Sequence, residues 1–231
     1  MKTLICLALA VGFSSTALAG SFTFTTGAGS TDSAGDPVSA QAIFVTGNGT
    51  LSITLSNLLV NQKDVGQNIS DLFFTLNNSA LTSGTIGTDG PDALVNVASN
   101  GTASSAGTGP SGWLLFFGGG NFLLNGLGGA TFVPSHTILG APGPGGVYSN
   151  ANASIAGNSP HNPFINQTAT WTLNITGITA NTIVTAATFS FGTTAGNNVP
   201  GVPGVPDGGT AGMLLGAALA GLGMLRRYLK N

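Results

Sequence analysis

Few side chains in this sequence could perform acid–base chemistry. It contains two histidines, His136 and His161, and seven acidic residues, all of them aspartates. Hydrolysis needs a nucleophile with a base, or a pair of carboxylates. Both histidines lie close to prolines in loop-like sequence, and no Gly-x-Ser-x-Gly elbow occurs. We therefore expect two exposed loop histidines, no catalytic residue and no enzymatic activity.

Two short segments carry paired aspartates. Asp32 and Asp36 are separated by Ser-Ala-Gly, and Asp89 and Asp92 by Gly-Pro. Carboxylate oxygens in loops suit Ca²⁺, but neither segment has the spacing of an EF-hand or of a Ca²⁺-binding nonapeptide repeat. Aspartate beside glycine and proline is typical of turns. The prediction is turn chemistry with no metal and no cofactor, and a Ca²⁺ site at either pair is the alternative.

Two aromatic residues and two glycine runs complete the candidates for binding. Trp171 lies on an alternating apolar face, which predicts a place in the core. Trp113 borders a glycine-rich loop, which predicts an exposed ring that could contact a carbohydrate. The glycines at 118–120 and 126–129 are not followed by Gly-Lys-Ser/Thr, so they are predicted to be hairpin or loop glycines, not a phosphate-binding loop.

The charge content excludes one class of function. Charged residues make up 5% of the chain, and Lys63 is the only lysine or arginine between Gly20 and Pro206. Nucleic-acid binding needs clustered Lys and Arg, so no nucleic-acid partner is expected. The polar surface must come from Thr, Ser, Asn and Gly, a composition that favours short strands and many turns.

The apolar pattern predicts an all-β domain. Leu51, Ile53 and Leu55 alternate with polar residues, and so do Ala169, Trp171, Leu173 and Ile175. About eight to ten such strands recur without helical patterns between them, which favours an antiparallel β-sandwich or jelly roll. Long loops are predicted at 101–112 and 140–163. The predicted strands are 22–26, 38–46, 50–56, 69–76, 93–98, 113–117, 169–176 and 183–191, with Ile183, Ala187, Phe189 and Phe191 on one side of the last.

The N-terminus has the three parts of a secretory signal peptide. Lys2 precedes a short apolar run, and Ala17 and Ala19 supply the small-x-small pattern of a cleavage site. Signal peptidase is therefore an expected partner, with cleavage between Ala19 and Gly20. Cys6, the single cysteine, would leave with the leader.

The C-terminus also has three parts in order. Val205–Gly209 is rich in residues that break regular structure, 211–225 is apolar on all sides, and Arg226 and Arg227 begin a basic end. Fifteen helical residues extend about 22 Å, less than the ~30 Å hydrocarbon core. A single short hydrophobic helix is predicted, with its basic end on the cytoplasmic side. A buried C-terminal helix is the alternative.

This tail resembles the PEP-CTERM class of sorting signals, and most closely its VPDSG-type variant. The residues that carry the resemblance are Val205, Pro206, Asp207, Gly208 and Gly209, followed by the apolar stretch and by Arg226 and Arg227. Gly208 stands where the variant has serine. The resemblance implies processing by an exosortase, a membrane-embedded cysteine transpeptidase, and attachment to the membrane through the helix before processing. The Pro/Gly repeat at 199–204 is predicted to be an extended spacer.

These features together predict an exported bacterial protein of the cell envelope, cell surface or extracellular matrix, with a non-enzymatic structural or adhesive role. Low charge would suit contact with neutral extracellular polysaccharide. The alternatives are a secreted carbohydrate-binding module and an unfamiliar secreted hydrolase. The predicted organisation is a signal peptide at 1–19, a β-sandwich-like domain at 20–198, a spacer at 199–204 and a sorting signal at 205–231.

Overall fold

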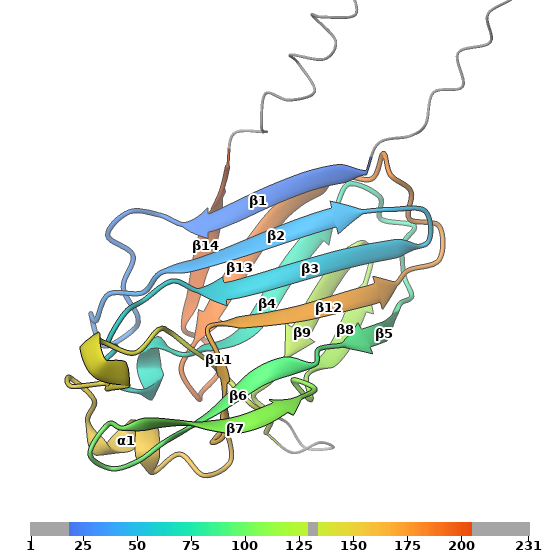
Figure 1. Ribbon diagram of the computed structural model, residues 1–231. Coiled ribbons are helices and arrows are strands. Elements are labelled where there is room, and N and C mark those ends of the chain that lie inside the picture. Colours follow the sequence, from blue (N-terminus) through green and yellow to red (C-terminus); the bar gives the residue numbers. More distant parts are fainter. Residues whose placement is uncertain (1–18, 129–133, 205–231) are drawn as a thin grey trace, which may run out of the picture.

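Short strands make up nearly all of the regular structure (Figure 1). The computed structural model describes residues 19–128 and 134–204. The only α-helix in these ranges is the single turn α1 (Ala153–Ala156), and two 3₁₀ turns cover Val65–Gln67 and Pro144–Gly146. The strands are β1 (Gly20–Thr26), β2 (Ala40–Thr46), β3 (Thr50–Asn57), β4 (Ile69–Leu76), β5 (Thr85–Asp89), β6 (Asp92–Val97), β7 (Ala103–Gly109), β8 (Leu114–Gly118), β9 (Asn121–Asn125), β10 (Ile138–Leu139), β11 (Phe164–Asn166), β12 (Thr168–Asn174), β13 (Val184–Phe191) and β14 (Asn198–Pro203).

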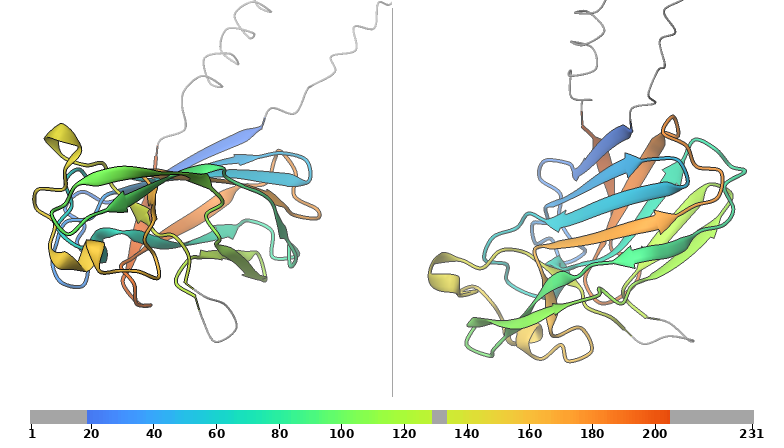
Figure 2. Two further views of the ribbon diagram at one scale, coloured as in Figure 1. Left: turned by 60° about the horizontal axis from the view of Figure 1, so that its bottom comes forward. Right: turned by 45° about the vertical axis from the view of Figure 1, so that its right-hand side comes forward.

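The strands form one curled sheet that folds into two facing layers (Figures 1 and 2). The first layer runs β5-β12-β3-β2-β1, and β14 pairs with both β1 and β13 and so joins it to the second. The second layer contains β13, β4, β9 and β8, and continues through β10 and β11 to β6 and β7. Neighbouring strands are antiparallel except β10 and β11. The predicted all-β antiparallel sandwich is confirmed.

Alternation places the apolar residues between the layers. In β3 and β12, Trp171 lies opposite Ile53 and Leu173 opposite Leu51, and all four side chains are buried. The intervening threonines and serines face outward because successive side chains of a strand point to opposite faces. The first layer therefore has the inner and outer faces that its sequence predicted.

A row of aromatic rings crosses the core from one layer to the other. Phe24 meets Phe44 edge-on at 5.9 Å between ring centroids, and Phe44 lies 5.2 Å from Phe74 of the facing layer. Phe74 stacks on Phe122 at 5.3 Å. Aromatic pairs at such spacings add to the stabilisation that burial itself provides. These contacts help to fix how the two layers pack against each other.

Two expectations about individual segments were wrong. Residues 103–109, expected to lie in a long loop, form β7 and pair with β6. Ile183, expected on the inner side of the last strand, lies just before β13 and is 46% exposed, whereas Val184, the first residue of β13, is buried. A register shift between Val184 and Ala186 moves the start of this strand out of phase with its end, which is the effect of a β-bulge.

The largest correction concerns the predicted spacer at 199–204. Residues 198–203 form β14, which lies between β1 and β13 (Figure 1). Its two prolines, Pro200 and Pro203, remove no ladder bond. Asn197 O accepts from the Phe191 N–H of β13, so by alternation the nitrogen of Pro200 points toward the β1 side, where pairing begins only at Gly201. The Gly204 N–H donates to Thr23 O, so the nitrogen of Pro203 points away from β1. The other neighbour, β13, pairs only with Asn198–Pro200, so Pro203 breaks no bond there.

No helix within 19–128 and 134–204 is long and apolar enough to cross a membrane. The hydrophobic stretch predicted at 211–225 lies outside these ranges, as do the motif residues 205–209 and Arg226 and Arg227.

Candidate functional site

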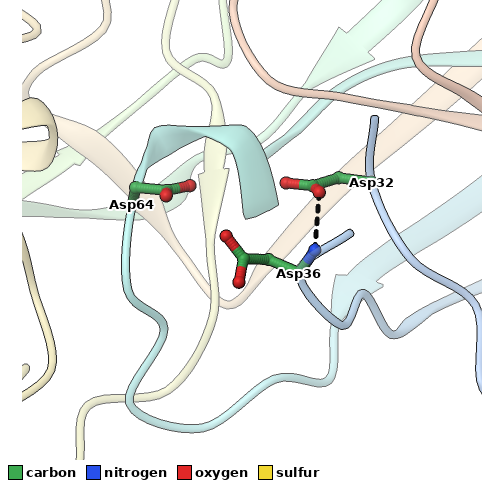
Figure 3. A group of neighbouring side chains, drawn as sticks. All are labelled: Asp32, Asp36 and Asp64. Carbon is green, nitrogen blue, oxygen red and sulfur yellow. Dashed lines mark hydrogen bonds between the residues drawn. The ribbon is translucent and has the colours of Figure 1, made fainter. Parts of the chain in front are cut away.

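Three aspartates from two loops converge on one small space (Figure 3). Asp32 and Asp36 belong to the loop between β1 and β2, and Asp64 precedes the 3₁₀ turn Val65–Gln67. One carboxylate oxygen of each lies within 4.8 Å of the others. The sequence predicted the pairing of Asp32 with Asp36 but missed Asp64, because no spacing rule relates residues in separate loops.

Hydrogen bonds within each loop fix these side chains. Asp32 is buried, and its Oδ1 accepts the N–H groups of Ala34 and Asp36, both at 2.9 Å. Asp64 Oδ1 accepts the Gly66 N–H at 2.9 Å and so caps the 3₁₀ turn. Such bonds are the turn chemistry that aspartate supplies in loops.

A single cation offsets part of the negative charge of this cluster. Lys63 Nζ lies 2.9 Å from Asp36 Oδ2, and its side chain is 55% exposed. The hydrogen bond to Asp36 and its charge raise the pKa of Lys63. Three carboxylates facing one ammonium leave net negative charge, and carboxylate oxygens are the ligands that Ca²⁺ prefers. The hydrogen bonds that these carboxylates accept nevertheless come from backbone N–H groups of their own loops and from Lys63.

The second predicted pair, Asp89 and Asp92, binds two different segments of the chain. Asp89 accepts the N–H groups of Ser111 and Gly112, both at 2.9 Å. Asp92 Oδ1 accepts from the backbone N–H of Thr170 at 3.0 Å and from its hydroxyl at 3.1 Å. The two side chains thus bind different segments. Both stabilise the corner at which the chain passes from β5 in one layer to β6 in the other.

Asp92 retains an unsatisfied oxygen. Its side chain is 4% exposed, and its Oδ2 has no hydrogen-bond partner among the described residues. Burial raises the pKa of Asp92 to about 6, although the bonds from Thr170 act in the opposite direction. The carboxylate at this corner is therefore poised to bind a proton under mildly acidic conditions.

Substituting Asp92 with asparagine should change how stability depends on pH. Unfolded aspartate titrates near pH 4, so between about pH 4 and 6 the folded chain holds a proton that the unfolded chain lacks. The Asp92 contribution to stability therefore falls as pH rises through this window. We expect the melting temperature of Asp92→Asn, measured relative to wild type, to rise between pH 4 and pH 7.

The comparison with wild type at each pH is required because other groups titrate in the same range. Burial raises the pKa of Asp71 to about 6 as well, whereas burial lowers the pKa of His161 and weakens the fold as pH drops. These contributions are common to both proteins. A melting-temperature difference that stays constant from pH 4 to pH 7 would contradict the assignment to Asp92.

The two histidines are bound to the backbone. His136 Nδ1 lies 2.5 Å from Pro163 O, and His161 Nδ1 contacts Ser135 O. His161 is only 3% exposed, so the expectation of an exposed loop residue was wrong for it. These two contacts connect the segment that contains Ser135 and His136 with the segment that contains His161 and Pro163.

Trp113 is buried, so the expectation of an exposed ring was wrong. It is 1% exposed and lies 5.1 Å, centroid to centroid, from Trp171. Its indole N–H donates to His136 O at 2.6 Å. Ser111 Oγ accepts from both the Trp113 backbone and the Trp171 indole. Trp113 borders a glycine-rich loop, but its ring packs into the hydrophobic core.

A shallow hollow of about 180 Å³ lies over β6 and β7. Its lining includes the polar residues Ser104, Ser105 and Asn166 and the apolar residues Leu94 and Pro142. Its described lining carries no charged side chain. Its surface is therefore neutral, like most of the described domain.

Both ends of the described domain lie on the same side of the molecule (Figure 2). Gly20, which follows the predicted signal-peptide cleavage site, is the first residue of β1 and lies opposite Thr46. Ala17 and the rest of the leader up to residue 18 are outside the described ranges. Gly204 ends the described chain, one residue before the predicted sorting motif.

The comparisons with known proteins identify this motif. Residues 204–229 match the family model of the VPDSG-CTERM motif. Neither a curated protein nor a solved structure matches the chain. The resemblance based on Val205–Gly209 and Arg226–Arg227 is confirmed. A signal of this kind marks an exported protein of the cell envelope that is handled by a CTERM sorting system, with a sorting enzyme as its partner.

Proposed function

With its VPDSG-CTERM motif as the premise, we propose that this chain is an exosortase substrate whose β-domain serves a structural or adhesive role at the cell surface or in extracellular polymer. The sorting motif carries this proposal, because it follows a folded β-domain directly. A signal peptide at 1–19 would deliver the domain across the membrane, and the apolar stretch at 211–225 would hold it there until processing.

The surface chemistry of the domain supports a non-enzymatic role. In residues 20–204 the formal charges are one lysine and six aspartates. Asp71 and Asp92 are buried, and Asp36 is paired with Lys63. The outward faces of strands such as β3 and β12 carry threonine, serine and asparagine. Hydroxyl and amide groups of this kind suit contact with neutral polysaccharide, which offers hydroxyls and no charge.

A specific carbohydrate-binding module was the main alternative. Its argument rested on an exposed Trp113, and that ring is buried. A hydrolase is the other alternative: Nδ1 of each histidine contacts a backbone carbonyl, which leaves Nε2 as the nitrogen that could act as a base, but no Gly-x-Ser-x-Gly elbow accompanies it. The broad structural role is therefore the better supported proposal.

Co-sedimentation with extracellular polymer from the native host tests this role. We expect the processed protein to sediment with the polymer in proportion to the amount added, without competition by free mono- and oligosaccharides. Saturable binding that a free sugar abolishes would favour a carbohydrate-binding module. Release of reducing ends that is lost in His136→Gln or His161→Gln would favour a hydrolase.

A further inference from the structure

The folded domain ends one residue before the sorting motif. The last strand, β14, extends to Pro203, and the Gly204 N–H donates to Thr23 O at 2.7 Å. The motif begins at Val205, and the family match begins at Gly204. The segment that the sequence predicted to separate the domain from the motif is therefore part of the sheet.

The two halves of β14 are held to different degrees. Asn198–Pro200 pair with β13, and Val199 is 9% exposed at the edge of the main core. Gly201–Pro203 pair with Phe24–Thr26 of β1, but Val202 is 52% exposed and Pro203 and Gly204 are exposed as well. The end of the strand is thus held to β1 mainly by backbone hydrogen bonds. Such an end can open locally while Val199 keeps the rest of β14 in place.

The position of the motif restricts how an enzyme can reach it. Six residues, 205–210, separate Gly204 from the apolar stretch that begins at Ala211. Fully extended, they span at most about 20 Å. A transpeptidase that takes an extended substrate segment must fit between the membrane and the folded domain. Backbone that is paired with β1 is not available to pair with the enzyme.

We propose that Val202–Gly204 act as a latch on sorting. While these residues are paired with β1, their backbone is not available to the processing enzyme, which acts on molecules in which they have come off β1. The inference rests on the proposed function, since it concerns the same processing step. It predicts that the rate of processing depends on the opening of the end of β14, with Val199 still buried.

An insertion in the full-length chain separates the latch from the motif. Six residues of Gly-Ser sequence are placed between Gly204 and Val205, which leaves the distance from the motif to the apolar stretch unchanged. The matched control carries the same six residues between Thr194 and Ala195, in the exposed turn between β13 and β14. Processing is followed by pulse-chase labelling in the native host, with proteolysis of the extracted protein to verify folding.

The insertion after Gly204 is expected to speed processing by roughly two- to tenfold. This is the change in an opening equilibrium that corresponds to one net backbone hydrogen bond. The control insertion is expected to leave the rate as in wild type. Equal rates for both insertions and wild type would overturn the latch while leaving the proposed function intact. A wild-type chain that is never shortened at its C-terminus would overturn the proposed function, and the latch with it.

Discussion

Replacing Trp113 with alanine is expected to lower the free energy of unfolding by about 3–5 kcal/mol, the usual cost of removing a fully buried aromatic side chain. The indole is 1% exposed and packs against Trp171 at 5.1 Å. Its removal would leave a cavity beneath the loop that precedes β8, and His136 O would lose its donor. Small domains are stable by about 5–15 kcal/mol, so this one change removes a large part of the total.

Urea unfolding followed by Trp171 fluorescence measures this effect. Phe117→Ala is the matched control, because Phe117 is an aromatic residue of the adjacent strand that is 45% exposed. We expect the control to lose markedly less stability than Trp113→Ala. If Trp113→Ala kept the wild-type unfolding midpoint and lost only retention on glycans, the indole would be a ligand contact and the described burial would be wrong.

Ending the chain after Asn197 is expected to abolish cooperative folding. This truncation removes Val199 from the core and the strand that joins the two layers. β1 and β13 would each expose an unpaired edge, and the backbone groups that now bond to β14 would lose their partners. The loss of a whole central strand exceeds what a domain of this size can tolerate.

A chain that ends after Gly204 is the matched control, and we expect it to fold with a single sharp thermal transition. Circular dichroism and protease resistance of the two truncated chains, expressed from Gly20, give the comparison. Equal melting temperatures would mean that residues 198–203 act as the spacer that their Pro/Gly sequence predicted.

The fold class could be predicted because it depends on a local signal. Alternation in 50–56 and 169–176 is read directly from the sequence, and in both segments the predicted inner residues are buried. Two of the three glycines at 118–120 lie in a hairpin turn, as predicted. Gly119 and Gly120 have positive φ angles in the turn between β8 and β9, a conformation that glycine adopts at little cost.

The wrong predictions share a different cause. Proline and glycine at 199–204 indicate a break in regular structure, but whether a proline disrupts a strand depends on which neighbours need its N–H. Here the two prolines fall where neither neighbour does. Trp113 was judged by the adjacent glycines, whereas its burial depends on Trp171, which lies far along the sequence. The convergence of Asp64 with Asp32 and Asp36 is likewise a property of the folded chain.

We infer that the chain is an exported protein whose C-terminal signal is processed. Intact mass measurement with terminal peptide mapping, performed on protein from the native host, tests this claim most directly. We predict a mature chain that begins at Gly20 and ends between Val205 and Gly209. A chain that retains residues 211–231 would contradict processing by an exosortase-type enzyme, and one that retains residues 1–19 would contradict the predicted signal-peptide cleavage.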